Sequence, residues 1–262
     1  MISRLLIIAG SDSGGGAGIQ ADIKTATAFG VYAMTAITAV TVQNTLGVRD
    51  WQPIDAAVVR GQIDACLSDI GADAIKTGML GDAAMVEAVA AALRGQSAPL
   101  VLDPVMVAKG GAKLLADEAV SAIRARLLSL ATIVTPNLPE CEALIGFAPA
   151  TDDEAREAAR KFHALGARHV LFKGGHAPGA IVRDILADGE TGALLVLEAP
   201  RIETRHTHGT GCTLASAIAS GLAQKRSLPD AVRRAHAYVQ DAIRTAPGLG
   251  GGHGPLNHFV RP

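Results

Sequence analysis

Aromatic residues and cysteines are scarce in this chain of 262 residues. Phe, Trp and Tyr make up 3% of it, so aliphatic side chains and alanine must fill any core. The three cysteines, Cys66, Cys141 and Cys212, fit neither a disulfide framework nor the spacing of a zinc site. We therefore expect a cytoplasmic protein in a reducing environment.

Excess charge and long apolar runs are also missing. Lys and Arg number 24 against 25 acidic residues, which argues against the basic footprint of a nucleic-acid or membrane-surface protein. No apolar stretch approaches the roughly 20 residues of a membrane span, and the run from Leu5 to Ala9 is too short for a signal peptide. A Gly-Lys pair is absent, which excludes a P-loop. These absences predict that the protein has neither a nucleic acid nor a membrane as its partner.

Aliphatic runs and helical patterns alternate along the chain, which predicts an α/β fold with a central, mostly parallel sheet flanked by helices on both faces. We expect one domain over residues 1–262, with the hairpin Ile181–Ala187 and Ala193–Glu198 as an antiparallel edge of the sheet. The runs expected to form the other strands are Arg4–Ala9, Thr35–Val42, Ala72–Lys76, Leu100–Asp103, Thr132–Thr135 and His169–Lys173. The expected helices include Asp55–Ser68, Asp82–Leu93, one that begins at Thr151 and closes at Gly166, and Ser227–Thr245.

The segment Gly209-Thr210-Gly211-Cys212 carries the strongest chemical signal, because it precedes an apolar run over Leu214–Leu222. Small residues before a helix leave free backbone N–H groups, and the helix dipole adds positive potential, so the segment predicts an anion site. Cys212 has two interpretations. A lone cysteine is commonly a small buried hydrophobe. At a helix N-terminus, however, a thiol's pKa falls from about 8.5 toward neutrality, which suits a base that accepts a hydroxyl proton.

The loops after the first two strands form a second candidate region. Five glycines lie among the nine residues of Gly10–Gly18. Such a loop is either a flexible turn or a segment whose backbone approaches and covers a ligand. Gln43 ends the second strand, where its amide can pair with a heterocycle edge that carries a ring nitrogen and an amino group. Gln is also common in loops, so this signal is weak by itself.

Charged residues follow three later strands, at the edge of a parallel sheet where ligands bind. Asp103 is placed either to form a turn with Pro104 or to meet Mg²⁺ or phosphate. Asn137 and Glu140 form a capping pair, and Glu140 can also lie near Mg²⁺ through a water molecule. Lys173 can meet nucleotide phosphates as a point charge. Three loop histidines give no zinc pattern: His176, His206 and His208.

Taken together, these motifs resemble the ribokinase-like superfamily and, within it, the bacterial hydroxymethylpyrimidine/phosphomethylpyrimidine kinases of thiamine biosynthesis. The resemblance runs over essentially the whole chain. It is carried by Ile8–Asp12, Gly14–Lys24, Thr41–Thr45, Lys76–Leu80, Leu102–Met106, Thr135–Glu140, Lys173–His176 and Thr207–Cys212. It implies ATP with Mg²⁺ as the phosphoryl donor and commonly a homodimer, and it leaves open whether a monovalent cation is needed. The implied acceptors are 4-amino-5-hydroxymethyl-2-methylpyrimidine and then its monophosphate.

The resemblance also implies roles for individual residues. Gln43 reads the aminopyrimidine edge, and Cys212 is the catalytic base. The other residues of the substrate pocket are Gly10, Ala17, Asp22, Met79 and Val105. Those that meet ATP are Asn137, Lys173 and Thr207. Those that serve Mg²⁺ and phosphate are Asp103 and Glu140. The anion hole consists of Gly209, Thr210 and Gly211.

Sugar kinases of this superfamily have an aspartate at the place of Cys212. The cysteine is expected in the pyrimidine branch and also in a related group of pyridoxal kinases. Pyridoxal or pyridoxine kinase is therefore the alternative activity, since both acceptors are nitrogen heterocycles with a hydroxymethyl group. A regulator that binds a nucleotide or pyrimidine on the same scaffold is a further alternative. The base at Cys212, with Asp103 and Glu140, favours an enzyme.

Overall fold

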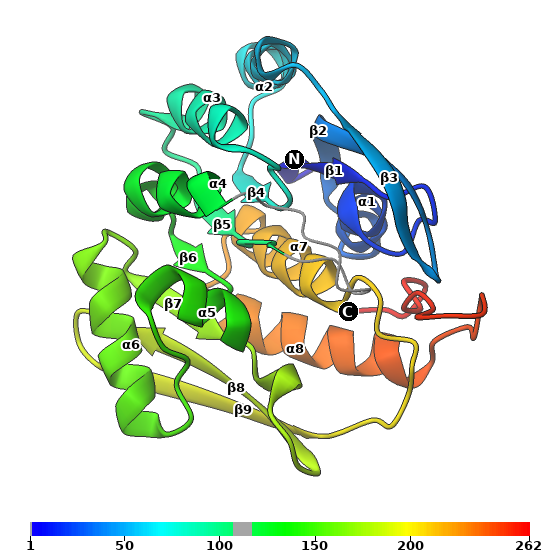
Figure 1. Ribbon diagram of the computed structural model, residues 1–262, viewed down its shortest axis with the longest axis vertical. Helices are drawn as coiled ribbons and strands as arrows, with labels where there is room; N and C mark the ends of the chain where they lie inside the picture. The colour runs from blue at the N-terminus through cyan, green and yellow to red at the C-terminus, as the bar shows by residue number, and fades with distance from the viewer. Residues whose placement is uncertain (1, 107–116) are drawn as a thin grey trace.

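The computed structural model describes residues 2–106 and 117–262 (Figure 1). Within this part of the chain, one sheet has the strand order β3-β2-β1-β4-β5-β6-β7-β8-β9. The strands are β1 (Arg4–Ser11), β2 (Tyr32–Asn44), β3 (Gly47–Pro53), β4 (Ala74–Thr77), β5 (Leu100–Leu102), β6 (Ile133–Val134), β7 (His169–Phe172), β8 (Ile181–Asp188) and β9 (Leu194–Pro200). The α-helices are α1 (Gly18–Ala28), α2 (Ala56–Asp69), α3 (Ala83–Leu93), α4 (Asp117–Ala122), α5 (Leu138–Ile145), α6 (Asp152–Ala164), α7 (Thr210–Ala223) and α8 (Leu228–Arg244).

The middle of the sheet is parallel and both of its edges are antiparallel. Strands β2, β1, β4, β5, β6 and β7 pair in parallel. The hairpin of β8 and β9 pairs antiparallel beside β7, as the sequence predicts. The expected α/β architecture, with its antiparallel edge hairpin, is therefore confirmed.

Strand β3 was not expected. It pairs antiparallel with β2 and forms the opposite edge of the sheet. Its residues Arg49, Asp50 and Gln52 are polar and its last residue is Pro53, so the segment lacks the aliphatic pattern of a buried strand. Polar residues and proline suit an edge strand, which has solvent on one side and needs no full ladder of hydrogen bonds.

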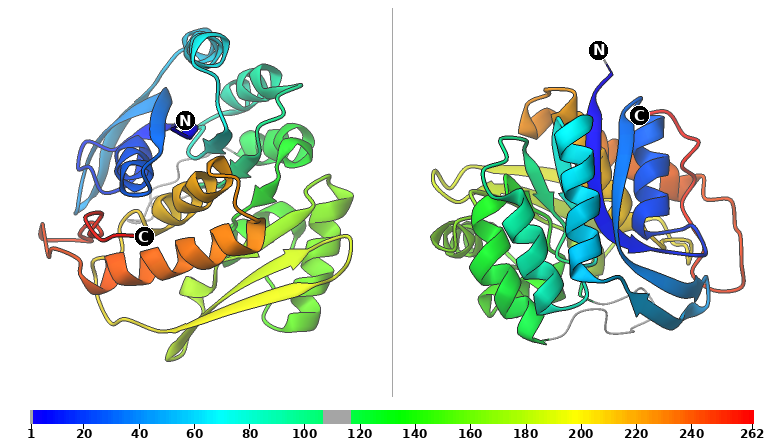
Figure 2. Two further views of the ribbon diagram at one scale, coloured as in Figure 1. Left: turned by 180° about the vertical axis from the view of Figure 1, so that it is seen from behind. Right: turned by 90° about the horizontal axis from the view of Figure 1, so that it is seen from above.

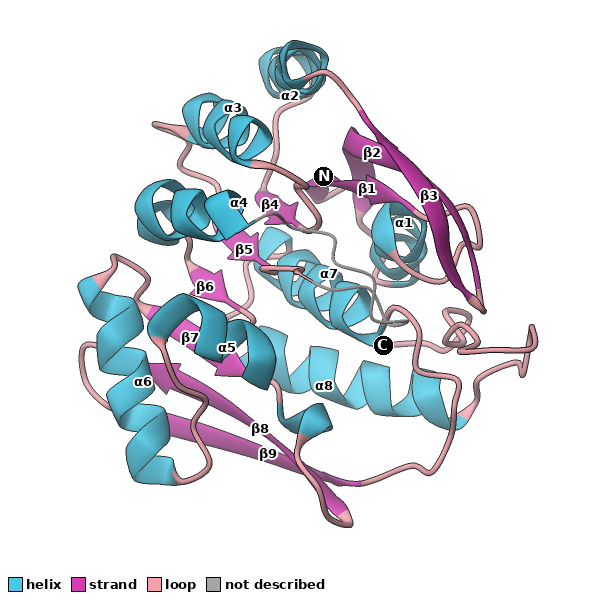
Figure 3. Ribbon diagram, in the orientation of Figure 1, coloured by secondary structure: helices cyan, strands magenta, loops and turns pink. Residues whose placement is uncertain are grey.

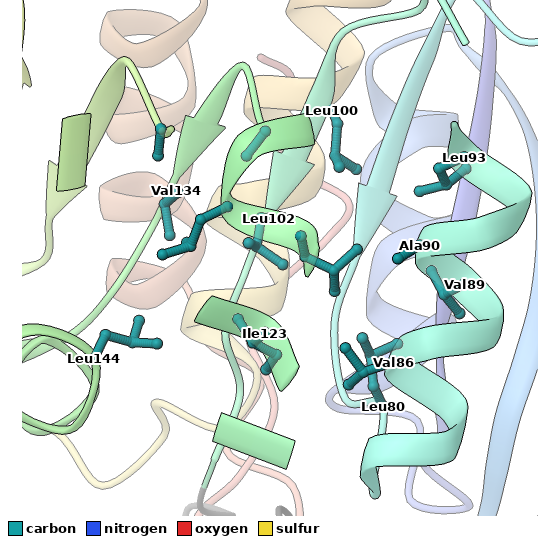
Figure 4. Packing of buried hydrophobic residues seen from close by; sticks show 14 of the residues in the cluster. Leu80, Val86, Val89, Ala90, Leu93, Leu100, Leu102, Ile123, Val134 and Leu144 are labelled. Carbon is teal, nitrogen blue, oxygen red and sulfur yellow. The ribbon is translucent and has the colours of Figure 1, made fainter. Parts of the chain in front are cut away.

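Helices cover both faces of the sheet (Figure 3). One buried cluster joins the sheet to α2, α3, α4, α5 and α6, and Figure 4 shows part of it, with Val86, Ala90 and Leu93 of α3 beside Leu100 and Leu102 of β5. A second cluster joins the other face to α1, α7 and α8, the helices nearer the viewer from behind in Figure 2. Alanine and aliphatic side chains dominate both clusters, as the scarcity of aromatic residues requires.

Local capping signals set where several helices begin. The Thr151 side chain accepts a hydrogen bond from Glu154 N, and the Glu154 carboxylate accepts one from Thr151 N, which confirms the expected capping box. Ser227 caps α8, whose first turn contains Pro229. None of the helices in the described residues has the length and apolarity needed to cross a bilayer.

Candidate active site

A cavity of about 810 Å³ lies where the parallel strands end. Its walls come from the loop after β1, the ends of β2, β4 and β5, the start of α5, the residue after β7 and the start of α7. These segments are far apart in sequence, and the parallel sheet brings their ends to one edge. Fourteen of the residues named from the sequence line it: Gly10, Ala17, Gln43, Met79, Asp103, Val105, Asn137, Glu140, Lys173, Thr207, Gly209, Thr210, Gly211 and Cys212.

Asp22 does not fit the expected pocket lining. Its side chain is fully buried in α1, where its carboxylate accepts hydrogen bonds from Lys76 Nζ at 2.8 Å and from Ser216 Oγ at 2.6 Å. Lys76, which the sequence analysis left without a role, lines the cavity in its place. The side chain of Asp22 points from α1 toward α7 and β4. Its carboxylate therefore contacts Lys76, which lines the cavity, and does not line the cavity itself.

The first turn of α7 offers backbone N–H groups to the cavity. Gly209 precedes the helix with φ at 82°, and among the described residues no side chain caps this turn. The Thr210 hydroxyl donates to the Thr207 carbonyl at 2.8 Å, which turns it back toward its own loop. A helix start without a cap has unsatisfied N–H groups and a positive dipole end, and both favour a bound anion.

Asp103, Glu140 and Lys173 form a buried charged group beside that turn. Lys173 Nζ lies 2.8 Å from Asp103 Oδ1 and 3.6 Å from Glu140 Oε2. A Cβ built on Gly211 would lie 3.4 Å from Lys173 Nζ, so the group and the helix start share one part of the cavity. Burial lowers the pKa of Lys173, but Asp103 and Glu140 outweigh it and raise that pKa above its usual value. Lys173 is therefore a permanent cation here.

Helix α5 fixes the position of Glu140. Asn137 Oδ1 accepts from Glu140 N at 2.9 Å, and Glu140 Oε2 accepts from Asn137 N at 2.8 Å. This is the capping pair that the sequence predicts. Glu140 Oε2 also faces Lys173, so capping and cavity chemistry use the same oxygen. Burial raises the pKa of Glu140, and Lys173 opposes that rise.

Cys212 departs from the expectation for a helix N-terminus. Burial raises the pKa of its thiol to about 11, while the charge of Lys76 acts in the opposite direction. The expected fall toward neutrality is therefore wrong for this thiol. The local rule considers the helix end alone, whereas the thiol is also enclosed by side chains and faces the carboxylates of Asp22 and Asp103.

A hydrogen bond between His208 and Asp12 links the two glycine-containing loops. His208 Nε2 lies 2.8 Å from Asp12 Oδ2, and because a carboxylate only accepts, that nitrogen carries a proton. The same carboxylate accepts from the backbone N–H groups of Gly14, Gly16 and Ala17. Burial raises the pKa of Asp12, but these bonds outweigh it, so the pKa lies below its usual value.

His208 also reaches the residue expected to read the acceptor. Gln43 Nε2 lies 3.3 Å from His208 Nε2, and Gln43 Oε1 lies 3.2 Å from Thr41 Oγ1. Sequence reasoning left His208 without a role, because its partner Asp12 lies 196 residues away. The signal available was position alone, since each residue adjoins a glycine loop expected at the sheet edge. Within the described residues, no group of three or more His, Cys, Asp or Glu side chains is arranged to hold a metal ion by itself.

Comparison with known proteins shows which family this chain belongs to. A family model described as phosphomethylpyrimidine kinase matches residues 12–257. The chain belongs to the phosphomethylpyrimidine kinase family. The hydroxymethylpyrimidine/phosphomethylpyrimidine kinase of Streptomyces coelicolor is 50% identical over 254 residues, which cover 97% of this chain and 93% of that protein. A thiamine biosynthesis bifunctional protein of Geobacter sulfurreducens is 51% identical, and this chain spans 52% of its length.

Solved structures with the same fold include kinases for two kinds of heterocycle. The ADP complex of Bacillus subtilis pyridoxal kinase superposes with a TM-score of 0.89 at 40% identity and covers 98% of both chains. The phosphomethylpyrimidine kinase of Clostridium difficile 630 gives a TM-score of 0.81 at 38% identity, covering 93% of this chain and 100% of that one. The ribokinase-like fold expected for this family member is confirmed.

Proposed function

We propose that this family member transfers the γ-phosphoryl group of ATP to 4-amino-5-hydroxymethyl-2-methylpyrimidine and then to the resulting monophosphate, for thiamine biosynthesis. The observation that carries the proposal is one cavity that joins Gln43, the uncapped start of α7 and the charged group of Asp103, Glu140 and Lys173. Phosphoryl transfer depends on positioning and on neutralising charge, and these residues supply both. Three relatives at 46–51% identity, two of them hydroxymethylpyrimidine/phosphomethylpyrimidine kinases and one a thiamine biosynthesis bifunctional protein, support the same acceptors.

The acceptor end of the cavity lies between β2 and the loop after β1. Gly10, Met79 and Val105 give this end small and apolar walls for a methylated ring. Gln43 offers an amide to the ring's amino edge. Ala17 lies on the loop that Asp12 holds against His208, which places it to cover the acceptor. The acceptor hydroxyl then faces Cys212, the proposed proton acceptor.

The nucleotide end of the cavity extends between α8 and the β8–β9 hairpin. Its apolar residues are Val182, Ile202, Val239 and Ile243. We place the adenine ring of ATP there, because a flat heterocycle is bound mainly by apolar contact. The phosphates then reach Asn137, Lys173 and Thr207 and end at the first turn of α7. A neighbour solved as an ADP complex supports ATP as the donor.

Asp103 and Glu140 are suited to a magnesium ion that arrives with the nucleotide. Asp103 Oδ2 is buried and has no hydrogen-bond partner among the described residues. Carboxylate oxygens are the donors that Mg²⁺ prefers, and it commonly takes one or two of them together with substrate phosphates. When bound, the ion would neutralise charge on the phosphates. Before that, Lys173 keeps the two carboxylates compensated.

Replacing Lys173 by methionine should weaken nucleotide binding. The substitution keeps the length of the side chain but removes the cation that meets the phosphates and pairs with Asp103. A hydrogen bond to a charged group contributes about 1.5–3 kcal/mol, so we expect the KM for ATP to rise by about 10- to 100-fold. Lys161→Met on α6 is the matched control, because Lys161 is exposed beside Glu157. Equal KM values in the two variants would contradict the role of Lys173.

Replacing Gln43 by alanine should raise the KM of both acceptors and leave the KM for ATP unchanged. Both acceptors carry the same ring edge, so both lose the same amide contacts. Loss of a hydrogen bond costs about 0.5–1.5 kcal/mol, which corresponds to about a 2- to 10-fold rise in KM. Initial rates with each acceptor measure the effect. Asn44→Ala is the control, since Asn44 Oδ1 accepts from Leu46 N at the outer end of the strand. A KM unchanged for either acceptor would remove Gln43 from the ring site.

Pyridoxal kinase activity is the second candidate, favoured by the TM-score of 0.89 to the Bacillus subtilis pyridoxal kinase. The test is ADP release from ATP and Mg²⁺ with the pyrimidine, with pyridoxal and with neither. Pyrimidine-dependent release supports the proposal. Faster turnover of pyridoxal would favour the second candidate, and no acceptor-dependent release would favour a binding protein.

Assembly and location complete the proposal. The resemblance implies a homodimer, and the exposed side chains of Val40, Val42 and Leu46 near the β2–β3 edge offer apolar surface for a second copy. A cytoplasmic location stays an expectation from the scarcity of cysteine. The resemblance also allows for a monovalent cation in addition to ATP and Mg²⁺.

A further inference from the structure

Lys76 is a buried cation for which the proposed chemistry above has no use. Its side chain is fully buried at the end of β4, and yet it borders the cavity. Its Nζ donates to Asp22 Oδ2 at 2.8 Å. A buried ion pair is often no more stabilising than a well-packed apolar pair. Stability therefore gives little reason for this pair, and its place beside the cavity suggests a chemical one.

Three elements fix the ammonium group relative to Cys212. Asp22 comes from α1, Lys76 from β4, and Ser216 from α7. Ser216 Oγ donates to Asp22 Oδ1 at 2.6 Å, so both carboxylate oxygens are engaged. Cys212 lies four residues before Ser216, which places the two side chains on one face of α7. The helix that carries the thiol is thus joined to the carboxylate that holds the lysine.

Lys76 is the main positive influence on the Cys212 thiol. The charged groups that face the thiol are Lys76, Asp22 and Asp103, and Lys173 also interacts with it. The backbone N–H of Gly18 also acts to lower the thiol's pKa. Burial raises the thiol's pKa, both carboxylates raise it further, and Lys76 lowers it more than Gly18 does. The helix end alone therefore does not account for a thiolate in this cavity.

We propose that Lys76 is a positioning residue for the reaction: it is the cation that stabilises the Cys212 thiolate, and Asp22 holds it in place. The inference rests on the proposed function, in which the sulfur accepts the acceptor's proton. The thiol first releases its proton to water, and the thiolate forms beside the ammonium group. The acceptor O–H bond then breaks and its proton forms an S–H bond. The oxygen keeps the electron pair and forms the new P–O bond as the bond between the γ-phosphorus and ADP breaks.

Because Lys76 and Asp22 carry opposite charges, removing one or the other should shift the ionisation of the Cys212 thiol in opposite directions. Lys76→Met removes the cation and should disfavour the thiolate. Asp22→Asn removes the competing negative charge but keeps a side-chain oxygen that can accept from Lys76 Nζ, so the ammonium group stays in place and the thiolate should be favoured. Damage to the fold would instead loosen the cavity in both variants and move them in the same direction. Lys161→Met is the control for losing a lysine far from the site.

The measurement is the rate of alkylation of Cys212 by iodoacetamide at pH 7, 8 and 9, in a Cys66→Ser/Cys141→Ala background that leaves one thiol. Thiolate nucleophilicity falls as the thiol's pKa falls, with a Brønsted coefficient of about 0.4–0.5, so a hundredfold change in the thiolate fraction changes the rate about tenfold. We expect Lys76→Met to react about tenfold more slowly than the background protein and Asp22→Asn about tenfold faster. The control should match the background.

Unchanged rates, or rates that move in the same direction in both variants, would overturn the inference. If Lys76→Met yields no folded protein by circular dichroism, Asp22→Asn decides alone, and a rate equal to or below the background overturns it. The assay needs neither ATP nor pyrimidine. If the rates change in opposite directions in a protein that shows no pyrimidine-dependent ADP release, the result supports the role of Lys76 toward the thiolate and refutes the pyrimidine as the acceptor. Unchanged rates in an enzyme that phosphorylates the pyrimidine would refute the role of Lys76 toward the thiolate and leave the proposed function intact.

Discussion

Cys212→Ala should slow the first phosphoryl transfer by about 10²- to 10⁴-fold, the range that general base catalysis supplies. The first acceptor is an alcohol, which holds its proton tightly. The second is a phosphate monoester, whose second pKa is about 6, so it is already mostly ionised at neutral pH. The second transfer should therefore lose much less. Single-turnover rates with each acceptor measure the two losses separately.

The control for this prediction is Cys66→Ala. Cys66 lies in α2, on the opposite face of the sheet from α7. The Cys66→Ala variant should phosphorylate both acceptors at the rates of the unchanged enzyme. Cys212→Ser provides a second comparison, because its hydroxyl keeps a donor and acceptor group at this position but ionises far less readily than a thiol. Equal losses in both transfers for Cys212→Ala would make the thiol a positioning group and not a base.

Gly209→Ala should lower both the stability and the turnover of the enzyme. Gly209 has φ at 82°, and a Cβ there would lie 1.8 Å from the carbonyl oxygen of Gly16. The left-handed conformation costs an alanine roughly 1–2 kcal/mol, and relieving the overlap costs about 1–3 kcal/mol more. Relief must push apart the start of α7 and the loop after β1. Displacing N–H donors at an anion site typically costs about 10²–10³ in kcat.

Gly95→Ala separates the two contributions to this effect. Gly95 has φ at 78°, but a Cβ there would meet no heavy atom within 4 Å. It should lose the conformational part of the free energy of unfolding and keep full activity. Chemical denaturation and steady-state kinetics of the two variants give the comparison. Gly209→Ala with the stability and kcat of Gly95→Ala would show that the anion site tolerates displacement of its first turn.

Patterns within a short stretch of sequence predicted most of the fold. Buried strands such as β1 and β7 contain runs of buried apolar residues, and the capping box at the start of α6 can be recognised within four residues. Strand β3 lacked such a signal, because an edge strand in contact with solvent can be polar. The residues after strand ends, Asp103 and Lys173, were found by the rule that parallel strands end at one edge.

Long-range pairs account for what the sequence did not predict. Asp12 meets His208 across 196 residues, and Asp22 meets Lys76 across 54, so no local spacing indicates either pair. The ionisation of Cys212 depends on the same tertiary contacts. A helix N-terminus predicts a lowered thiol pKa, but burial and two carboxylates raise it, and the lysine that opposes them comes from strand β4. The location of the thiol was predictable, and its electrostatics were not.

The number of phosphoryl groups placed on the pyrimidine tests the central claim most directly. The purified protein is incubated with excess ATP and Mg²⁺ and with 4-amino-5-hydroxymethyl-2-methylpyrimidine, and the products are followed by mass spectrometry together with ADP. The proposed function predicts a monophosphate that appears first and a pyrophosphate that replaces it, with two ADP formed for each pyrimidine consumed. Pyrimidine recovered unchanged while pyridoxal is phosphorylated, or while no ADP forms, would contradict it.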